Sequence, residues 1–375
     1  MTLETRAVEI LRELGARPAA PFFEEGPAGY IFSLLAGLGV DPWRDAYGNI
    51  VARYRDLPAD TDQPPVAFVA HMDHPGFEVV EAGEGPQIAR ALGGVPAASL
   101  KKPTPVLVLA PDGDWIPAET VPLASDASGR EVELRLPDGV VLNRPVPVVF
   151  DLPDFELDGD TLRMRALDDL AGCAAILAAL ERLVAEGAHA DVFAVFTRAE
   201  EVGLYGARLM AEEGTLPEST LVVSVESSAV IPGVAQGAGP VIRTGDAAYT
   251  FDADAEQVLI AARERIRERD AEYRSQRQLM SGGTCEATAF AVFGYRATGI
   301  AFPLGNYHNA TTRIPDPEGG VDAEYIKLAD FLGGVELVYE AAKSIAAGVE
   351  SPTRRRMGQV PDEARERLMG RARGA

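Results

Sequence analysis

The chain has 375 residues, of which 47% are hydrophobic and 25% are charged, a composition typical of a globular protein with a sizeable core and more than one domain. Its net charge of −22 repels phosphate groups, so the charge argues against a nucleic-acid binder and against an anionic membrane surface. No run of about 18 uncharged apolar residues occurs, and the sequence therefore predicts no transmembrane helix.

The start of the chain and its cysteines indicate where the protein works. Residues Met1–Arg6 are polar and lack the basic-then-apolar pattern of a signal peptide. The two cysteines, Cys173 and Cys285, are too few for a disulfide framework. We therefore expect a protein of the reducing cytoplasm.

In its first half the chain changes from helical to β-type patterning. Residues 3–15 and 27–38 have helix-like spacing, and residues 45–53 read as a turn that leads into a strand. Between residues 74 and 155, short alternating segments are separated by turns rich in Gly and Pro. Such a region is typical of a small antiparallel β-barrel or sandwich.

From residue 166 onward, strands and helices alternate as in a parallel sheet, with a charged helix predicted at 256–278 and a closing amphipathic helix at 323–346. We predict an α/β fold, a mixed sheet flanked by helices with an inserted small β-barrel. The predicted domains are a discontinuous catalytic domain (1–73 and 156–350), the insert (74–155) and a basic tail (351–375).

The tail differs in charge from the rest of the chain. Residues 354–373 contain seven Arg against Asp362, Glu363 and Glu366. We interpret this segment as a solvated tail or a frayed helix. The alternative is that it docks onto an acidic neighbouring subunit.

Four apolar runs end in, or just before, side chains that bind transition metals. The carboxyl ends of parallel strands lie at one rim of an open α/β sheet, where such sheets place their active sites. These side chains are His71 after residues 66–70, Glu200 and Glu201 after 192–197, Glu226 after 221–225, and His308 beyond 298–304. We expect them to converge at this rim, together with Asp168 at the start of an apolar helix.

Two His and three carboxylates at one rim can hold two divalent ions that share a bridging carboxylate. Asp168 is the natural bridge, although taken alone the Asp168-Asp169 pair would be read as a helix cap. Zinc is the first candidate for such mixed ligands, and cobalt or manganese also fits. The arrangement predicts a hydrolytic site.

Neighbouring residues complete this chemistry. One carboxylate of the Glu200-Glu201 pair could bind metal while the other acts as general base toward a bound water, whose pKa metal binding lowers to about 7. Asp73 is placed to accept the second imidazole N–H of His71 and so to orient the ring. His74 is a candidate substrate contact at the pocket mouth, and His189 is interpreted as structural.

A set of short motifs, in this order, resembles the tetrahedral or glutamyl aminopeptidases, cytosolic dinuclear zinc metallopeptidases related to leucyl aminopeptidases and carboxypeptidases. The resemblance extends from about residue 48 to 345, and the β-rich insert is also a mark of the family. The motifs are Gly48-Asn49, His71-Met72-Asp73 with Gly76-Phe77, Ala166-Leu167-Asp168-Asp169 with Gly172-Cys173, Glu200-Glu201-Val202-Gly203-Leu204 with Gly206-Ala207, Gly239-Pro240-Val241-Ile242, Gly282-Gly283-Thr284, and Pro303 with Tyr307-His308.

The resemblance implies roles for individual residues. The implied roles are His71, Asp168 and Glu226 as ligands of one ion, Asp168, Glu201 and His308 as ligands of the other, Glu200 as general base, and Asp73 as the residue that orients His71. It also implies a cis peptide bond between Asp168 and Asp169.

Two positions depart from the family pattern. The family usually carries Asp where this chain has Glu226, and Glu there is more similar to the carboxypeptidase and N-acyl-amino-acid deacylase branches. The family sequence Gly-Thr-Asp-Ala is replaced by Gly283-Thr284-Cys285-Glu286-Ala287. The first departure concerns substrate recognition, because the Asp that the family usually carries at position 226 helps to receive a free N-terminus. The second removes an acidic group near the pocket or shifts it by one residue.

We expect an aminopeptidase that removes N-terminal residues from short peptides by means of a metal-bridging hydroxide, with Glu200 as general base. The alternatives are a carboxypeptidase or N-acyl-amino-acid deacylase with the same metal core and a non-catalytic assembly protein. The expected partners are a peptide substrate and further copies of this chain, in a dimer or a larger shell built from dimers, as the resemblance implies.

Overall fold

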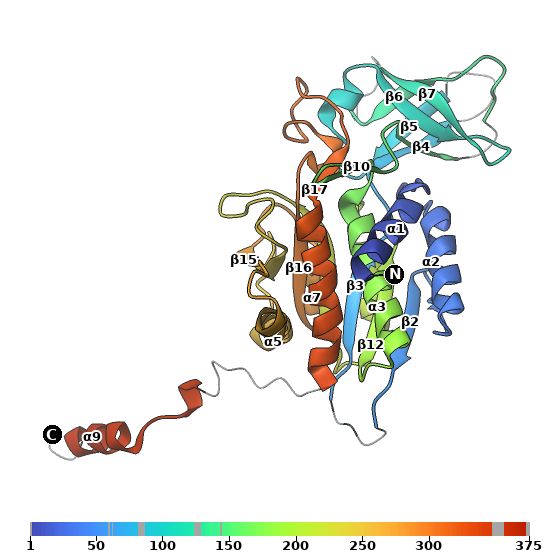
Figure 1. Ribbon diagram of the computed structural model, residues 1–375. Coiled ribbons are helices and arrows are strands. Elements are labelled where there is room, and N and C mark those ends of the chain that lie inside the picture. The colour runs from blue at the N-terminus through green and yellow to red at the C-terminus, as the bar shows by residue number, and fades with distance from the viewer. Residues whose placement is uncertain are drawn as a thin grey trace.

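A mixed eight-stranded sheet forms the centre of the protein, in a computed structural model that describes residues 2–58, 61, 63–81, 87–123, 129–142, 145–346 and 356–372. The sheet order is β1-β2-β12-β3-β13-β16-β14-β15 (Figure 1). The strands are β1 (Trp43–Arg44), β2 (Ile50–Arg55), β3 (Val66–His71), β12 (Asp191–Thr197), β13 (Leu221–Ala229), β14 (Val241–Gly245), β15 (Gln276–Leu279) and β16 (Arg296–Leu304). This sheet confirms the predicted α/β class.

Four central strands, β12, β3, β13 and β16, run parallel to one another. Strands β3 and β12 are buried along their whole length, which is why their sequences are almost continuously apolar rather than alternating. Thr197 pairs with His71 at the carboxyl ends of these two strands. The expected convergence of strand ends at one rim is therefore observed.

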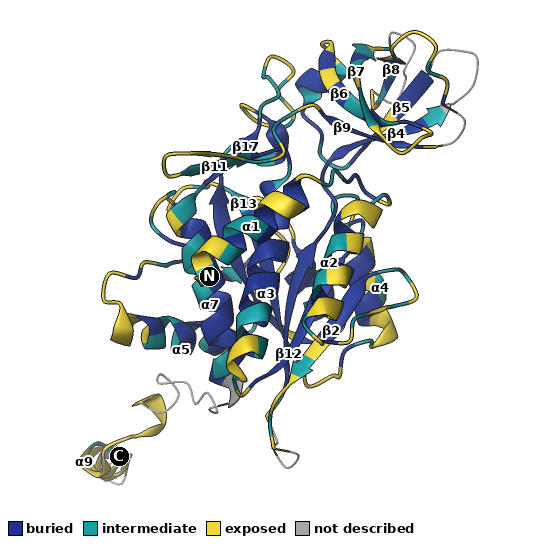
Figure 2. Ribbon diagram, turned by 45° about the vertical axis from the view of Figure 1, so that its right-hand side comes forward, coloured by how far each residue is buried: buried dark blue, intermediate teal, exposed yellow. Residues whose placement is uncertain are grey.

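Helices cover both faces of the sheet (Figure 2). One face packs against α1 (Leu3–Gly15), α2 (Glu25–Gly37), α3 (Leu167–Glu186), α5 (Ala253–Arg269) and α7 (Leu328–Ala346). The other packs against α4 (Tyr205–Glu213) and α6 (Glu286–Val292). Helix α3 is buried on nearly all sides, since it is apolar around its whole circumference.

The β-rich region forms a closed six-stranded barrel of order β4-β5-β8-β7-β6-β9, as predicted. Its strands are β4 (Gly76–Glu81), β5 (Gln87–Leu92), β6 (Thr104–Leu109), β7 (Trp115–Pro122), β8 (Glu131–Arg135) and β9 (Pro147–Phe150). The barrel has a core of its own, in which Phe77 and Phe150 pack edge to face at 5.8 Å. Figure 1 shows it beyond one end of the sheet.

A small sheet and two short helical turns lie near the barrel. The sheet contains β10 (Glu156–Asp158), β11 (Thr161–Met164) and β17 (Glu324–Lys327), and the turns are η1 (Ala97–Leu100) and η2 (Tyr307–Asn309). The loop after β5 reaches the rim of the main sheet, where the carbonyl oxygen of Gly94 lies 3.1 Å from Nδ1 of His308 in η2.

Two predicted helices extend too far. The helix predicted at 256–278 ends at Arg269, and residues 276–279 form β15, which pairs with β14. The helix predicted at 323–346 begins at Leu328, because residues 324–327 pair with β11. In both cases pairing with a distant strand overrides the local helical pattern.

Of the predicted tail, residues 351–355 and 373–375 lie outside the described residues, and Asp362–Ala372 form α9 with Leu368 and Met369 exposed. In the described part of the chain, no helix combines the length and apolarity needed to cross a membrane.

Phe331 on α7 tests the core between helix and sheet. Its side chain is fully buried and packs against Phe302 at 5.7 Å. We expect Phe331→Ala to lower the free energy of unfolding by about 3–5 kcal/mol, through lost burial and the cavity left behind. Val292, which is 61% exposed, is the control. Val292→Ala should change the free energy of unfolding by no more than about 0.5 kcal/mol. Urea denaturation followed by circular dichroism measures both, and equal losses would contradict this packing.

Candidate active site

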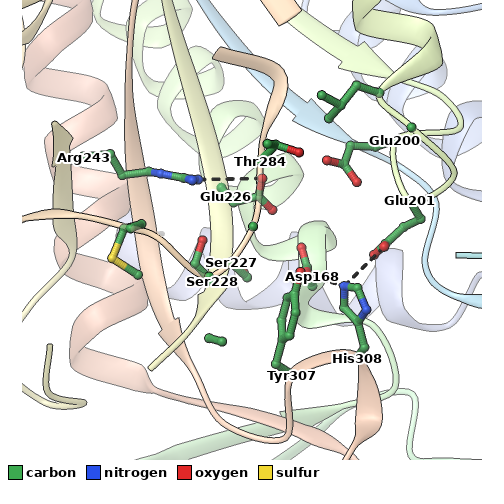
Figure 3. A pocket seen from close by; sticks show the side chains of 16 residues that line it. Asp168, Glu200, Glu201, Glu226, Ser227, Ser228, Arg243, Thr284, Tyr307 and His308 are labelled. Carbon is green, nitrogen blue, oxygen red and sulfur yellow. Dashed lines mark ion pairs between the residues drawn. The ribbon is translucent and has the colours of Figure 1, made fainter. Parts of the chain in front are cut away.

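The five predicted ligand residues meet at the rim of the sheet. Figure 3 shows Asp168, Glu201, Glu226 and His308 among them. Nε2 of His71 lies 3.2 Å from Oδ1 of Asp168 and 3.5 Å from Oε1 of Glu226. Nε2 of His308 lies 3.2 Å from Oε2 of Glu201 and 3.7 Å from Oδ2 of Asp168. The two carboxylate oxygens of Asp168 therefore face different histidines, the geometry of a bridging residue. The peptide bond between Asp168 and Asp169 is cis, as the resemblance implies.

The residues at this rim fit divalent metal ions. Buried carboxylate oxygens of Asp168, Asp169 and Glu201 have no hydrogen-bond partner among the described residues. Ligand atoms lie within 4.8 Å of one another in three groups: His71, Asp168 and Glu201; His71, Asp169 and Glu226; and Glu200, Glu226 and Glu286. Imidazole and carboxylate donors of this kind suit zinc, cobalt or manganese. Orphaned buried oxygens are expensive unless a cation or a proton satisfies them.

The electrostatics of the site favour the uptake of positive charge. Burial raises the pKa of Asp168 well above its usual value, and the nearby Glu226 raises it further. Burial likewise raises the pKa of Glu201, with Asp168 adding to the effect. Burial alone would lower the pKa of His71, yet Glu200, Asp168 and Glu226 together raise it well above 6.5. In the absence of ions, the cluster therefore holds protons instead.

His308 is held in its neutral form. Burial, with a smaller effect from His74, lowers the pKa of His308 to about 3. Its Nδ1 lies 3.1 Å from the carbonyl oxygen of Gly94, which accepts a hydrogen bond from the N–H of the neutral ring. The lone pair of Nε2 is then directed toward Glu201 and Asp168, as metal ligation requires.

Asp73 differs from expectation in the atom that faces His71. Nδ1 of His71 lies 3.0 Å from the main-chain oxygen of Asp73 and 3.7 Å from its carboxylate. The carboxylate instead accepts hydrogen bonds from the backbone N–H groups of Glu200 and Glu201, at 3.0 and 3.1 Å. Asp73 thus connects His71 to the loop that carries the two glutamates.

The loop after β12 is supported by two further residues, Glu24 and Asn49. Oε2 of Glu24 accepts a hydrogen bond from Arg198 at 2.7 Å, and Oε1 accepts one from the backbone N–H of Ala199 at 2.9 Å. Burial, followed by the charge of Asp73, raises the pKa of Glu24 to about 7. Oδ1 of Asn49, in the Gly48-Asn49 motif, accepts the backbone N–H of Arg198. The role of Glu24 had no signal in the sequence.

Two other supporting residues were not predicted. Glu324 accepts hydrogen bonds from the backbone N–H groups of Asp168 at 3.0 Å and His308 at 2.9 Å. His74 was expected to contact substrate at the pocket mouth, but it is buried between the carbonyl oxygen of Asp168 and the side chain of Asn309. His74 therefore supports the backbone of Asp168 and does not face substrate. In the sequence, its position three residues after His71 was the signal that it belongs to the site. His189 is 77% exposed beside Asp56, away from these residues.

A cavity of about 240 Å³ opens beside the cluster. Asp168, Glu200, Glu201, Glu226 and His308 line one part of it. The rest of the lining includes Arg243, Met280, Thr284 and Tyr307. The reacting groups and the remaining wall of the cavity therefore face the same space.

Comparisons with known proteins point to one family. Residues 144–317 match the M42 glutamyl aminopeptidase family. The chain is 35% identical over 98 residues to a putative aminopeptidase of Acetivibrio thermocellus, a match that covers 25% of this chain and 29% of that protein. The matched segment is thus less than a third of that relative.

Solved structures share the fold along nearly their whole length. The TET1 peptidase of Pyrococcus horikoshii, which can assemble into a tetrahedron or a large octahedral shell, is 24% identical, with a TM-score of 0.72 over 90% of this chain and 99% of that one. Aminopeptidase APDkam598 from Desulfurococcus kamchatkensis is 23% identical, with a TM-score of 0.73 over 94% and 99%. The match over residues 144–317 and the shared fold confirm the resemblance drawn from the motifs.

Proposed function

We propose that this protein is an aminopeptidase that uses two divalent ions to remove N-terminal residues from short peptides. The observation that carries the proposal is Asp168, whose two oxygens face His71 on one side and His308 on the other. The M42 family match and the names of similar aminopeptidases support the same activity.

His71, Asp168 and Glu226 would hold one ion, and Asp168, Glu201 and His308 the other. Zinc is the first candidate, and cobalt or manganese also fits these ligands. When bound, such ions polarise a scissile carbonyl and lower the pKa of water to about 7.

Glu200 is the proposed general base. Its carboxylate lies 3.9 Å from Nε2 of His71, and its backbone N–H is fixed by Asp73. Burial raises the pKa of Glu200, so its carboxylate binds a proton more readily than an exposed one. Glu200 would take a proton from the attacking water and deliver it to the leaving amine.

The runner-up is a carboxypeptidase or N-acyl-amino-acid deacylase with the same metal core. One observation favours it: Oε2 of Glu226 lies 3.8 Å from Nη1 of Arg243. A carboxylate that faces a guanidinium has less negative potential to offer a substrate ammonium group.

We further propose that the protein forms a homo-oligomer, because similar solved structures are described as a dodecamer and as a tetrahedron or an octahedral shell. We also propose that it works in the cytoplasm, as expected from its two cysteines. Within each subunit, residues 1–73 and 156–350 would form the catalytic domain and 74–155 the insert. Size-exclusion chromatography with light scattering tests the assembly, and a monomer at micromolar concentration would contradict it.

Glu200→Gln tests the general base. We expect it to lower kcat by about 10²–10⁴-fold while metal content stays at the wild-type level, because the amide cannot accept the proton. Glu212→Gln, on the exposed face of α4, is the matched control and should leave kcat unchanged. Steady-state kinetics with metal analysis measures both, and turnover within a few-fold of wild type would rule out this role.

A pair of substrates separates the aminopeptidase from the runner-up. We expect metal-loaded enzyme to hydrolyse Leu-p-nitroanilide and to leave its N-acetylated form intact, since an aminopeptidase requires the free amine. A chelator-treated sample is the control. Activity on N-acyl amino acids alone would transfer the protein to the deacylase branch.

Metal removal should destabilise the protein, and more strongly at pH 8 than at pH 6. Glu286 lies close to Glu200 and Glu226 in a group that could hold an ion, and burial raises its pKa to about 7, from a usual value of 4.5. The folded, metal-free chain then binds more protons than the unfolded chain, and this stabilisation is lost as pH rises through about 7. Differential scanning calorimetry with and without chelator measures the shift in Tm, and an equal shift at both pH values would contradict the expectation.

A further inference from the structure

One buried cation in the cavity has no role in the chemistry above. Arg243 on β14 is only 2% exposed, and its side chain lines the cavity opposite His308 (Figure 3). Its Nε and Nη1 atoms are buried and lack a hydrogen-bond partner among the residues that the structure describes. A buried guanidinium with unpaired donors is costly unless an acceptor reaches it.

The neighbouring carboxylates do not supply that acceptor. Glu226 is the nearest, and its Oε2 lies 3.8 Å from Nη1, beyond hydrogen-bond distance. Asp246 already accepts hydrogen bonds from three backbone N–H groups and from the hydroxyl of Thr288. Glu286 accepts hydrogen bonds from two buried hydroxyls. The Nε and Nη1 donors of Arg243 are therefore available to a hydrogen-bond acceptor that enters the cavity.

The position of Arg243 places such a group close to the reacting atoms. Oε1 of Glu226 lies 3.5 Å from His71, while its Oε2 lies 3.8 Å from Arg243. The carboxylate of Glu226, itself a predicted ligand, thus lies between the guanidinium of Arg243 and His71. A group bound to Arg243 would belong to the residue at the scissile bond or to its immediate neighbour.

We propose that Arg243 is a specificity residue that binds a carboxylate of the substrate. The planar guanidinium offers paired N–H donors that match the two oxygens of a carboxylate. The carboxylate has two sources: the side chain of an acidic residue beside the scissile bond, or the α-carboxylate of a terminal or N-acylated amino acid. This inference rests on the proposed hydrolytic function of the same cavity.

The competing explanation is that Arg243 only balances the negative charge of Glu226. The two explanations differ in what a lysine can replace. Lys keeps the charge but not the paired, planar donors, so it restores charge balance without restoring carboxylate recognition.

The experiment compares R243M and R243K with the wild type on two pairs of matched substrates. Glu-p-nitroanilide against Gln-p-nitroanilide tests a side-chain carboxylate, and N-acetylleucine against N-acetylleucinamide tests an α-carboxylate. R296M, at an exposed Arg on β16, is the matched control and should behave as wild type. Circular dichroism checks the fold of each variant, and R243K carries the test if R243M does not fold.

We expect R243M to lower kcat/KM for the carboxylate member of one pair by about 10- to 100-fold, the loss of a hydrogen bond to a charged group. The amide member should stay within about threefold, and R243K should remain below wild type on the carboxylate member. The pair that responds identifies the source of the carboxylate. Equal losses on both members, or full rescue by R243K, would overturn the proposal.

A binding measurement separates this inference from the proposed function. If the wild type hydrolyses none of these substrates, the proposed hydrolase fails, and thermal shifts with glutamate against glutamine and with N-acetylleucine against its amide decide the role of Arg243. If the carboxylate compounds raise Tm in the wild type but not in R243M, Arg243 binds the carboxylate even without turnover. Equal shifts for carboxylate and amide would overturn it.

Discussion

The excess of buried carboxylates at one rim of the sheet is the constraint on which the site depends. Burying an ionised carboxylate is expensive unless a cation or several hydrogen bonds compensate it. The carboxylates at this rim are those of Asp73, Asp168, Asp169, Glu200, Glu201, Glu226, Glu286 and Glu324. The described cations close to them are Arg243 and the histidines, and His308 is neutral because burial lowers its pKa to about 3. Divalent ions are the compensation that this arrangement supports.

The fold meets part of this cost with hydrogen bonds between distant segments, which fix the backbone of several site residues. Asp73 holds the backbone of Glu200 and Glu201, and Glu324 holds the backbone of Asp168 and His308. Three of these contacts connect segments more than 120 residues apart, and the contact between Glu324 and His308 spans 16 residues. Such preorganisation is what allows fixed charges to act on a reacting group without rearrangement.

The N-terminal helices contribute to this preorganisation. Glu24 stands directly before α2 and reaches the loop after β12, where it binds Arg198 and the backbone of Ala199. Ala199 has a positive φ of 52°, a conformation that a non-glycine residue adopts only when its surroundings enforce it. A residue at the start of α2, far from Glu200 in sequence, thus helps to fix the loop that carries Glu200.

The ligand residues could be predicted from the sequence because each follows a buried strand or begins a buried helix, and parallel strands bring their ends together. The barrel was predictable for a similar reason, since turns and alternating segments are local signals. Glu324 and Arg243 gave no such signal, because their roles arise from contacts with segments distant in sequence. The same cause shortened two predicted helices, where residues 276–279 and 324–327 pair with distant strands.

The departures from the family pattern lie around Arg243, which lines one wall of the cavity. Glu226 carries one methylene more than the usual Asp, so its two oxygens can face His71 and Arg243 at the same time. Burial by itself lowers the pKa of Arg243. Cys285 and Glu286, the second departure, are buried close to Arg243, and together with Glu226 and Asp246 they raise its pKa above the usual value. The opposite wall, with Asp168, Glu201 and His308, keeps the residues that the resemblance implies. Because the side with the predicted ligands is retained while the Arg243 side has changed, the departures bear on the proposed choice of substrate rather than on the proposed hydrolytic chemistry.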